Sequence, residues 1–230
     1  MDLSRFEVMS FDCYGTLIDW ESGILTAFAP VLAARGVKWE ADRILHEYAT
    51  AESAVEATPA FLKYSQVLDE VARRVAAVAG FQATVQERNA LSESVPHWEP
   101  FPDTVDALRA LAKKFKLVIV SNIEDALFTQ TARKLRINFH AVITAEQARA
   151  YKPNRAMFDL ALHKVGVAKE KWVHAGASLF HDVGPANALG IQTVYVNRRF
   201  EEESGGASPR TDATPGLEVH DLAELARLAA

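Results

Sequence analysis

The chain has 230 residues, of which 49% are hydrophobic and 24% charged, and its formal net charge is -5 at pH 7. A chain of this size can bury a sizeable core, either as one large domain or as a domain with an insertion. The acidic balance and the lack of a basic stripe argue against nucleic acid as a partner. No apolar stretch approaches the ~20 residues that span a bilayer, and the N-terminus lacks a signal-peptide pattern. We therefore expect a cytoplasmic protein that acts on a small molecule, with no membrane partner.

The N-terminal part of the chain predicts one strand followed by a long helical segment. Residues 6–11 have the length and apolar content of a buried strand. The next ninety or so residues lack clear strand signals and instead show helical periodicity in four stretches, at 21–36, 40–57, 60–80 and 83–94. Three prolines within 96–103 mark the return to the main domain. We predict a helical cap over residues 18–97, inserted into a core made of 1–17 and 98–230.

After this return, predicted helices and strands alternate. Helical patterns lie at 103–114, 124–135 and 155–166, and strand-like runs lie at 116–120, 140–144, 171–175 and 191–196. Such alternation requires parallel strands joined by crossover helices, so we predict a doubly wound α/β sheet. Residues 201–216 are polar and rich in glycine and proline, which predicts a surface loop before a final short strand and helix.

Polar side chains follow four of the strand-like runs, at the edge where an open parallel sheet binds its ligands. These residues are Asp12 after the first run, Ser121 and Asn122 after the second, Lys152 after the third, and Ser178 and Asp182 after the fourth. Each alone is commonly a helix cap or part of a solvated loop. Together they predict a site at the carboxyl edge of the sheet.

The segments FDCYGTLIDW (11–20), VIVSN (118–122) and YKPN (151–154) resemble motifs of the type II, or L-2-haloacid, dehalogenases within the haloacid dehalogenase superfamily. This resemblance implies a Rossmann-like core, a helical cap that closes over the site, commonly a homodimer, and hydrolysis of 2-haloalkanoic acids to 2-hydroxy acids. It also implies a role for each matching residue: Asp12 as the nucleophile, Thr16, Ser121 and Lys152 in support of it, Asn122 near the leaving halide and Asp182 near the hydrolytic water.

Two positions argue against the metal-dependent phosphatases of the superfamily. Those enzymes have a second acid two residues after the nucleophile and another acid five residues before the equivalent of Asp182, where this chain has Tyr14 and Ala177. A phosphatase needs a magnesium ion held by carboxylates and an acid to protonate the leaving alkoxide, whereas a halide leaves without a proton. We therefore expect no metal and no other cofactor. Asp12 would form an ester with the substrate carbon, and water positioned by Asp182 and Ser178 would hydrolyse it.

Several positions depart from the dehalogenase pattern or allow two interpretations. The pattern has a serine and an asparagine where this chain has Ala177 and Leu179, and a tyrosine where it has Phe158. The candidate for the substrate-binding arginine of the cap is Arg43, which lies in the matching helix, although we favour the alternative of a solvated side chain. The two aromatic candidates for substrate contact, Tyr14 and Tyr64, could equally be packing residues, and we interpret the single cysteine, Cys13, as packing.

Three candidate functions therefore remain. The first is hydrolysis of a small anionic 2-haloacid. The second is a phosphatase acting on a small phosphate ester, and the third is a non-catalytic protein that binds a small anion. Chloride release from 2-chloropropionate, measured beside phosphate release from p-nitrophenyl phosphate, separates the three.

Overall fold

The computed structural model of the chain describes residues 1–200 and 211–230. Its strands form a parallel sheet of six, in the order β3-β2-β1-β4-β5-β6. The strands are β1 (Val8–Phe11), β2 (Lys116–Ser121), β3 (Ala141–Thr144), β4 (Trp172–Gly176), β5 (Gln192–Val196) and β6 (Leu217–Val219). The central strand β1 pairs Phe11 with Ile119 on one side and with Ala175 on the other. The predicted α/β sheet is confirmed, while residues 201–210 of the predicted loop lie outside the described residues.

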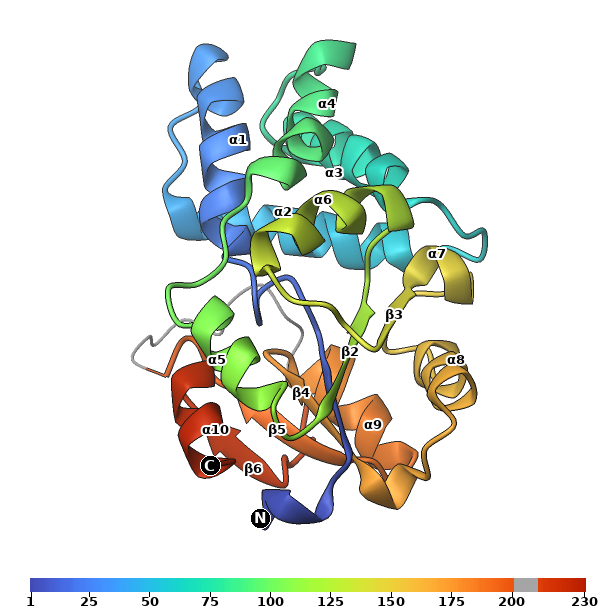
Figure 1. Cartoon of the computed structure of the whole chain (residues 1–230). Coiled ribbons are helices and arrows are strands. Elements are labelled where there is room, and N and C mark those ends of the chain that lie inside the picture. The colour runs from blue at the N-terminus through green and yellow to red at the C-terminus, as the bar shows by residue number, and fades with distance from the viewer. Residues whose placement is uncertain (201–210) are drawn as a thin grey trace.

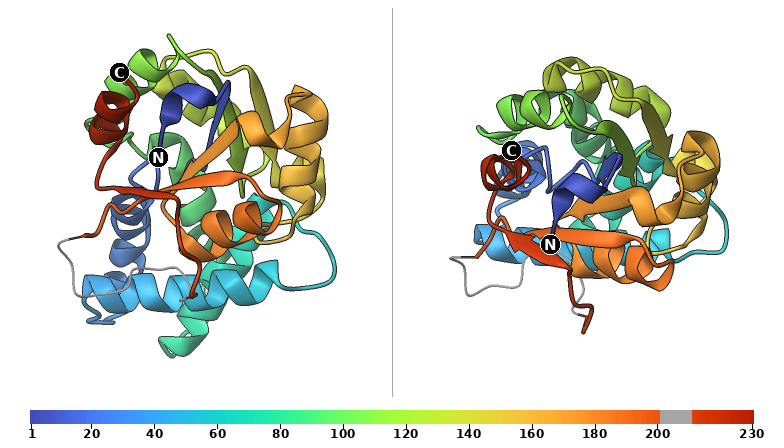
Figure 2. Two further views of the ribbon diagram at one scale, coloured as in Figure 1. Left: turned by 90° about the horizontal axis from the view of Figure 1, so that it is seen from below. Right: turned by 60° about the horizontal axis from the view of Figure 1, so that its bottom comes forward.

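Helices cover both faces of this sheet, as Figure 2 shows with α5 and α10 on one side and α9 on the other. The core helices are α5 (Thr104–Leu111), α6 (Asp125–Leu135), α7 (Ala145–Ala148), α8 (Ala156–Val165), α9 (Gly184–Ala188) and α10 (Leu222–Leu228). Short turns of helix complete the core: η1 (Leu3–Arg5), η3 (Lys169–Lys171) and the π-helix η4 (Leu179–Val183). Because both faces are covered, every residue of β1 is buried, which explains why three of its four residues are apolar.

Four further helices lie between β1 and α5, and Figure 1 shows them gathered beyond one end of the strands. They are α1 (Trp20–Ala34), α2 (Ala41–Glu56), α3 (Tyr64–Val78) and α4 (Val85–Ser94), followed by η2 (Val95–His97). They pack against one another, α2 on α3 and α3 on α4, through apolar residues spaced three or four apart. In α1 these residues are Ile24, Phe28 and Leu32. Both chain termini lie at the opposite end of the molecule in Figure 1.

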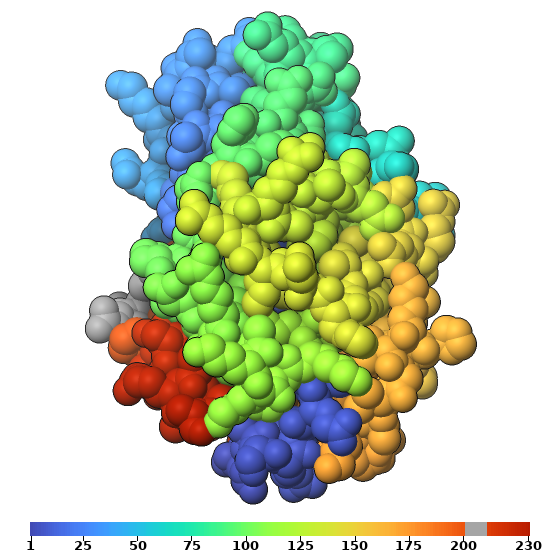
Figure 3. All heavy atoms as spheres, viewed as in Figure 1, coloured from blue at the N-terminus to red at the C-terminus, as the bar shows by residue number. Residues whose placement is uncertain are grey.

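The inserted helices also contact the core beyond the two chain connections. Helix α6 packs against η2, and the space-filling view shows its residues lying directly against the inserted segment (Figure 3). The carboxyl ends of the strands therefore face a second layer of side chains. Among the helices of residues 1–200 and 211–230, none combines the length and the apolar character that a membrane crossing requires.

Candidate active site

Asp12 comes directly after β1 and is only 7% exposed. Its backbone N–H donates to the carbonyl of Ala175 at 3.0 Å, which fixes the residue to the neighbouring strand β4. Its Oδ1 accepts from Lys152 Nζ at 2.9 Å, and its Oδ2 accepts from Thr16 Oγ1 at 2.9 Å. The Thr16 oxygen in turn accepts from the backbone N–H of Ala177 at 2.9 Å. Both carboxylate oxygens of Asp12 are thus held in place.

Lys152 reaches this edge from the connection after β3 and is 2% exposed. Its Nζ donates to Asp12, to Asp182 Oδ1 at 2.6 Å and to the carbonyl of Val120 at 2.9 Å. Its backbone N–H donates to Asn122 Oδ1 at 2.7 Å, which fixes the connection. An ammonium has three N–H donors, so Lys152 is fully engaged with the protein.

Asp182 lies on η4, and its two oxygens have different partners. Oδ1 accepts from Lys152 and lies 3.3 Å from His174 Nε2, while Oδ2 accepts from the backbone N–H of Ser178 at 3.1 Å. The carboxylate rests against Gly176 at the end of β4, where an added Cβ would lie 2.4 Å from Asp182 Cγ. Glycine at this position is therefore a condition for the close approach of Asp182 to the strand.

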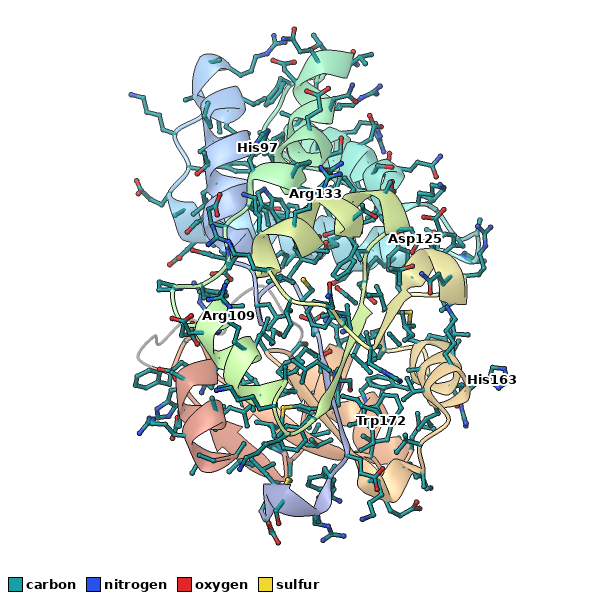
Figure 4. The ribbon with its side chains drawn as sticks, viewed as in Figure 1. His97, Arg109, Asp125, Arg133, His163 and Trp172 are labelled. Carbon is teal, nitrogen blue, oxygen red and sulfur yellow. The ribbon has the colours of Figure 1, made fainter. Side chains whose placement is uncertain are left out.

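A buried polar chain continues from Asp182 into the interior of the sheet. The Ser10 hydroxyl lies 2.8 Å from His174 Nδ1 and accepts from Trp172 Nε1 at 2.7 Å. Trp172 is labelled in Figure 4, in the half of the molecule away from the inserted helices. Phe158, which replaces the expected tyrosine, packs edge-on against His174 with a centroid distance of 4.9 Å. We did not predict His174 as a site residue, although a histidine within an apolar strand pattern is a recognisable signal.

Burial and neighbouring charges shift the pKa values of these three groups. Burial raises the pKa of Asp12; Lys152 opposes this rise and Asp182 adds to it. Burial also disfavours the ionised form of Asp182, but the charge of Lys152 and the contact with His174 outweigh it and hold the pKa of Asp182 well below its usual range. Burial alone would lower the pKa of Lys152, yet the two carboxylates raise it, so the ammonium stays charged.

A cavity of about 90 Å³ opens beside Asp12, a volume suited to a small substrate. It is lined by Asp12, Tyr14, Gly15, Trp20, Glu52, Glu56, Tyr64, Ser121, Asn122, Lys152, Ala177, Ser178, His181 and Asp182. The structure thus brings most of the predicted site residues to one cavity. Thr16 lies behind Asp12 and is fully buried. Ser121 lines the cavity, but no hydrogen bond in the described part of the chain joins its hydroxyl to Asp12.

The two tyrosines of the cavity both pack and face it. The Tyr14 hydroxyl lies 2.7 Å from Thr131 Oγ1 on α6, and its ring packs edge-on against Trp98. Burial raises the pKa of Tyr14 well above its ordinary value, so it is a poorer proton donor than a free tyrosine. The Tyr64 hydroxyl donates to Glu52 Oε1 at 2.6 Å.

The structure places Arg43 outside this cavity. Its side chain is 56% exposed, lies 3.9 Å from Glu47 Oε1 and stacks over the Trp39 ring at 4.3 Å. Arg43 is in the first turn of α2, whereas the residues of α2 that line the cavity, Glu52 and Glu56, are in its last two turns. The side chain of Arg43 is therefore solvent-exposed in this structure.

Glu52, Glu56 and His181 are lining residues that we did not assign to the site. The two glutamates are four residues apart and share a helix face with the buried Tyr48, a spacing visible in the sequence. Burial lowers the pKa of His181 to about 4, so its ring is neutral at pH 7. Its Nδ1 lies 3.2 Å from the hydroxyl of Ser178.

The donor set does not fit a magnesium ion. Within the described ranges, no group of three or more His, Cys, Asp or Glu side chains is placed to hold a metal. Magnesium prefers six oxygen ligands in octahedral geometry, whereas the position between Asp12 and Asp182 is taken by the Lys152 ammonium. The positive charge at this edge therefore comes from a side chain.

Comparison with known proteins places these observations in a family. The chain is 26% identical to an (S)-2-haloacid dehalogenase of Pseudomonas putida, over 97% of this chain and 96% of that one. It is 30% identical to a glyceraldehyde 3-phosphate phosphatase of Methanopyrus kandleri, over only 55% of each chain. The fold matches the L-2-haloacid dehalogenase of Xanthobacter autotrophicus with chloropropionic acid covalently bound, with a TM-score of 0.80, 20% identity, and coverage of 97% of this chain and 98% of that one. Residues 6–190 match the family model described as haloacid dehalogenase-like hydrolase, and the chain belongs to this family of hydrolases.

Proposed function

We propose that the protein hydrolyses the carbon–halogen bond of small 2-haloalkanoic acids and releases 2-hydroxy acids. The observation that carries this proposal is the state of Asp12. It is a carboxylate held by Lys152 and Thr16 at the wall of a small cavity, and the position two residues later offers Tyr14, whose hydroxyl is engaged by Thr131. A nucleophile without a neighbouring carboxylic acid suits a leaving group that needs no proton. Relatives that span nearly the whole chain are 2-haloacid dehalogenases.

In this mechanism an Asp12 oxygen attacks the carbon that bears the halogen, the carbon–halogen bond breaks, and halide leaves with its electron pair. The product is an ester between Asp12 and the 2-carboxyalkyl group. Lys152 and Thr16 keep the carboxylate ionised and aimed, with Ser121 beside it and Asn122 near the departing halide. Water then attacks the ester near Asp182 and Ser178. The covalently bound chloropropionic acid in the Xanthobacter dehalogenase supports an ester of this kind.

We also propose that residues 18–97 act as a cap that closes over the substrate and excludes bulk water. In support, Trp20, Glu52 and Tyr64 of the inserted helices line the same cavity as Asp12. A homodimer, as the resemblance to the dehalogenases implies, and a cytoplasmic location, as the sequence pattern predicts, belong to the same proposal. The molar mass in solution, measured by light scattering, tests the dimer.

The test of this function is the release of chloride from 2-chloropropionate, measured with and without EDTA beside phosphate release from p-nitrophenyl phosphate. We expect chloride release that EDTA does not reduce, and none from an Asp12→Asn variant. A single turnover in ¹⁸O-water should give mostly unlabelled product and label in the peptide that contains Asp12, because solvent oxygen enters only when the ester is hydrolysed. Magnesium-dependent phosphate release would instead establish the phosphatase alternative, and loss of both activities would favour a non-catalytic anion-binding protein.

A further inference from the structure

The cavity has an unusual balance of charge for a site that receives an anion. Four carboxyl groups line it, from Asp12, Asp182, Glu52 and Glu56, and the cation among its lining residues is Lys152. All three N–H donors of that ammonium are already bonded to the protein. A bound carboxylate would add one more negative charge beside these groups, which is unfavourable unless a neighbouring acid is neutral.

Two of the donor side chains that line this cavity, Lys152 and Asn122, are already engaged by the protein, which leaves neutral donors such as the hydroxyl of Ser121. The Asn122 amide group donates to Glu56 Oε2 at 3.2 Å and to the carbonyl of Lys152 at 3.2 Å, so both of its N–H groups are used. The lining includes no arginine, since Arg43 lies outside. A new donor that points into the cavity would therefore improve the binding of a carboxylate.

The four carboxyl groups differ in how well their ionised forms are supported. Asp12 and Asp182 share Lys152. Glu52 Oε1 accepts from the hydroxyls of Tyr64 at 2.6 Å and Tyr48 at 3.0 Å. Glu56 has a single neutral donor, the Asn122 amide at 3.2 Å, and in the described part of the chain its Oε1 has no partner. Among the four carboxyl groups, Glu56 is thus the one whose protonation is least unfavourable.

We propose that Glu56 determines the specificity of this site by acting as a neutral carboxylic acid, whose Oε1 hydroxyl donates a hydrogen bond to the carboxylate of the substrate. It supplies from α2 the donor that Arg43 does not supply. This inference rests on the proposed function for its choice of an anionic substrate. The direction of the pKa shift agrees, because burial, followed by the charge of Glu52, raises the pKa of Glu56 well above its ordinary value.

Several titratable or charged groups surround Glu56 and are part of this balance. They are Glu52, Tyr48 and Tyr64 on the inserted helices, Tyr151 and Lys152 after β3, His181 and Asp182 on η4, and Asp12 after β1. Tyr48, Tyr64 and Tyr151 have raised pKa values, mainly through burial, and stay neutral at pH 7, while His181 is neutral there as well. Lys152 keeps its charge, and Asp182 keeps its own down to acidic pH. Among these groups, the carboxyl groups whose pKa values are raised are therefore Glu56, Glu52 and Asp12.

The test uses propionate, an anion that lacks a halogen and is not turned over, and propionamide, its neutral counterpart. Calorimetric titration of the wild-type protein between about pH 5 and pH 9 should show propionate affinity falling by about tenfold per pH unit above the pKa of Glu56. Propionamide affinity should not change with pH. Titration in buffers with different ionisation enthalpies should show uptake of close to one proton per propionate in that range, a measurement that needs no variant.

Glu56→Gln keeps an N–H donor but cannot ionise, so its propionate affinity should be independent of pH and close to the low-pH value of the wild type. Glu47→Gln, on the same helix and outside the cavity, is the matched control and should retain the wild-type slope. The inference is overturned if Glu56→Gln retains that slope, if the wild-type affinity does not depend on pH, or if propionate does not bind at all. Chloride release, measured separately, decides the proposed function. A protein that binds propionate in this way but releases no chloride would lose the function and keep the inference.

Discussion

At the scale of single residues, the hydroxyl of Thr16 supports the ionised form of Asp12. It donates to Asp12 Oδ2 at 2.9 Å, and burial has already raised the pKa of that carboxyl group. Nucleophilic attack needs ionised Asp12, so activity is present above this pKa and is lost as the pH falls through it. A hydrogen bond to a charged group contributes about 1.5–3 kcal/mol, which corresponds to about one pH unit or more.

We therefore predict that Thr16→Val shifts the acidic limb of kcat/KM upward by about one pH unit, because the variant keeps the shape of the side chain and removes its donor. The measurement is the pH profile of chloride release. Thr16→Ser, which keeps the hydroxyl, should follow the wild-type profile. An acidic limb that does not move in Thr16→Val would show that Thr16 does not influence the ionisation of Asp12.

The site residues that could be predicted from the sequence are those that lie just after the ends of strands. Asp12 directly follows an apolar run, and Lys152 lies in the connection after another. A parallel sheet brings such positions together at one edge, independently of how the helices pack. Glu56 and Arg43 both lie on α2, and which turns of this helix meet the cavity depends on how it packs on α3. Periodicity gives the face of a helix but not its axial position over a site, so it does not decide whether Arg43 or Glu56 meets the cavity.

At the scale of secondary-structure elements, the end of β4 and the π-helix η4 place Asp182 against Gly176. An added Cβ at Gly176 would lie 2.4 Å from both Cγ and Oδ2 of Asp182. Contacts this short force the carboxylate away from Lys152 and His174, and overpacking of this kind typically costs about 1–3 kcal/mol.

We predict that Gly176→Ala lowers kcat at least about tenfold and lowers the free energy of unfolding by about 1–3 kcal/mol. Chloride release and urea unfolding measure the two effects. Gly184→Ala is the control in the same segment, because its added Cβ would meet nothing closer than Leu179 O at 3.4 Å. If Gly176→Ala had wild-type kcat, the close approach of Asp182 to β4 would not be needed for turnover.

The elements that the sequence predicted well are the long periodic ones. The predicted helices at 40–57 and 124–135 appear as Ala41–Glu56 and Asp125–Leu135. The short elements α7, α9 and η4 were not predicted, because four or five residues carry too little periodicity. η4 depends instead on local bonds, such as the Ser178 hydroxyl accepting from the backbone N–H of His181 at 3.0 Å.

At the scale of the whole molecule, side-chain bonds tie the inserted helices to the core near the cavity. Glu124, just before α6, accepts from both the backbone N–H and the hydroxyl of Ser65 at the start of α3, at 2.9 and 2.7 Å. The Tyr151 hydroxyl donates to the carbonyl of Leu62 at 2.9 Å. These bonds cross between two layers that the chain itself joins only at the segments around Asp19 and Glu99. They are therefore among the contacts that opening of the proposed cap would have to break, together with the Asn122–Glu56 hydrogen bond and the Lys63–Glu146 ion pair.

Glu124→Ala should loosen this closure without unfolding the sheet. Glu124 is 7% exposed, and its side chain makes no capping bond to α6, so the substitution removes mainly the two bonds to Ser65. Hydrogen bonds to a charged group contribute about 1.5–3 kcal/mol, so the open state should become about 10 to 100 times more populated.

Backbone amides around 62–68 should exchange faster by that factor, while those of β1 and β4 keep their wild-type rates, and propionate affinity should fall. Glu93→Ala, at an exposed position of α4, should change neither measurement. Unchanged amide exchange around 62–68 in Glu124→Ala would mean that the inserted helices are held to the core by other contacts. Faster amide exchange in β1 and β4 by the same factor would mean that the two layers open only as one unit.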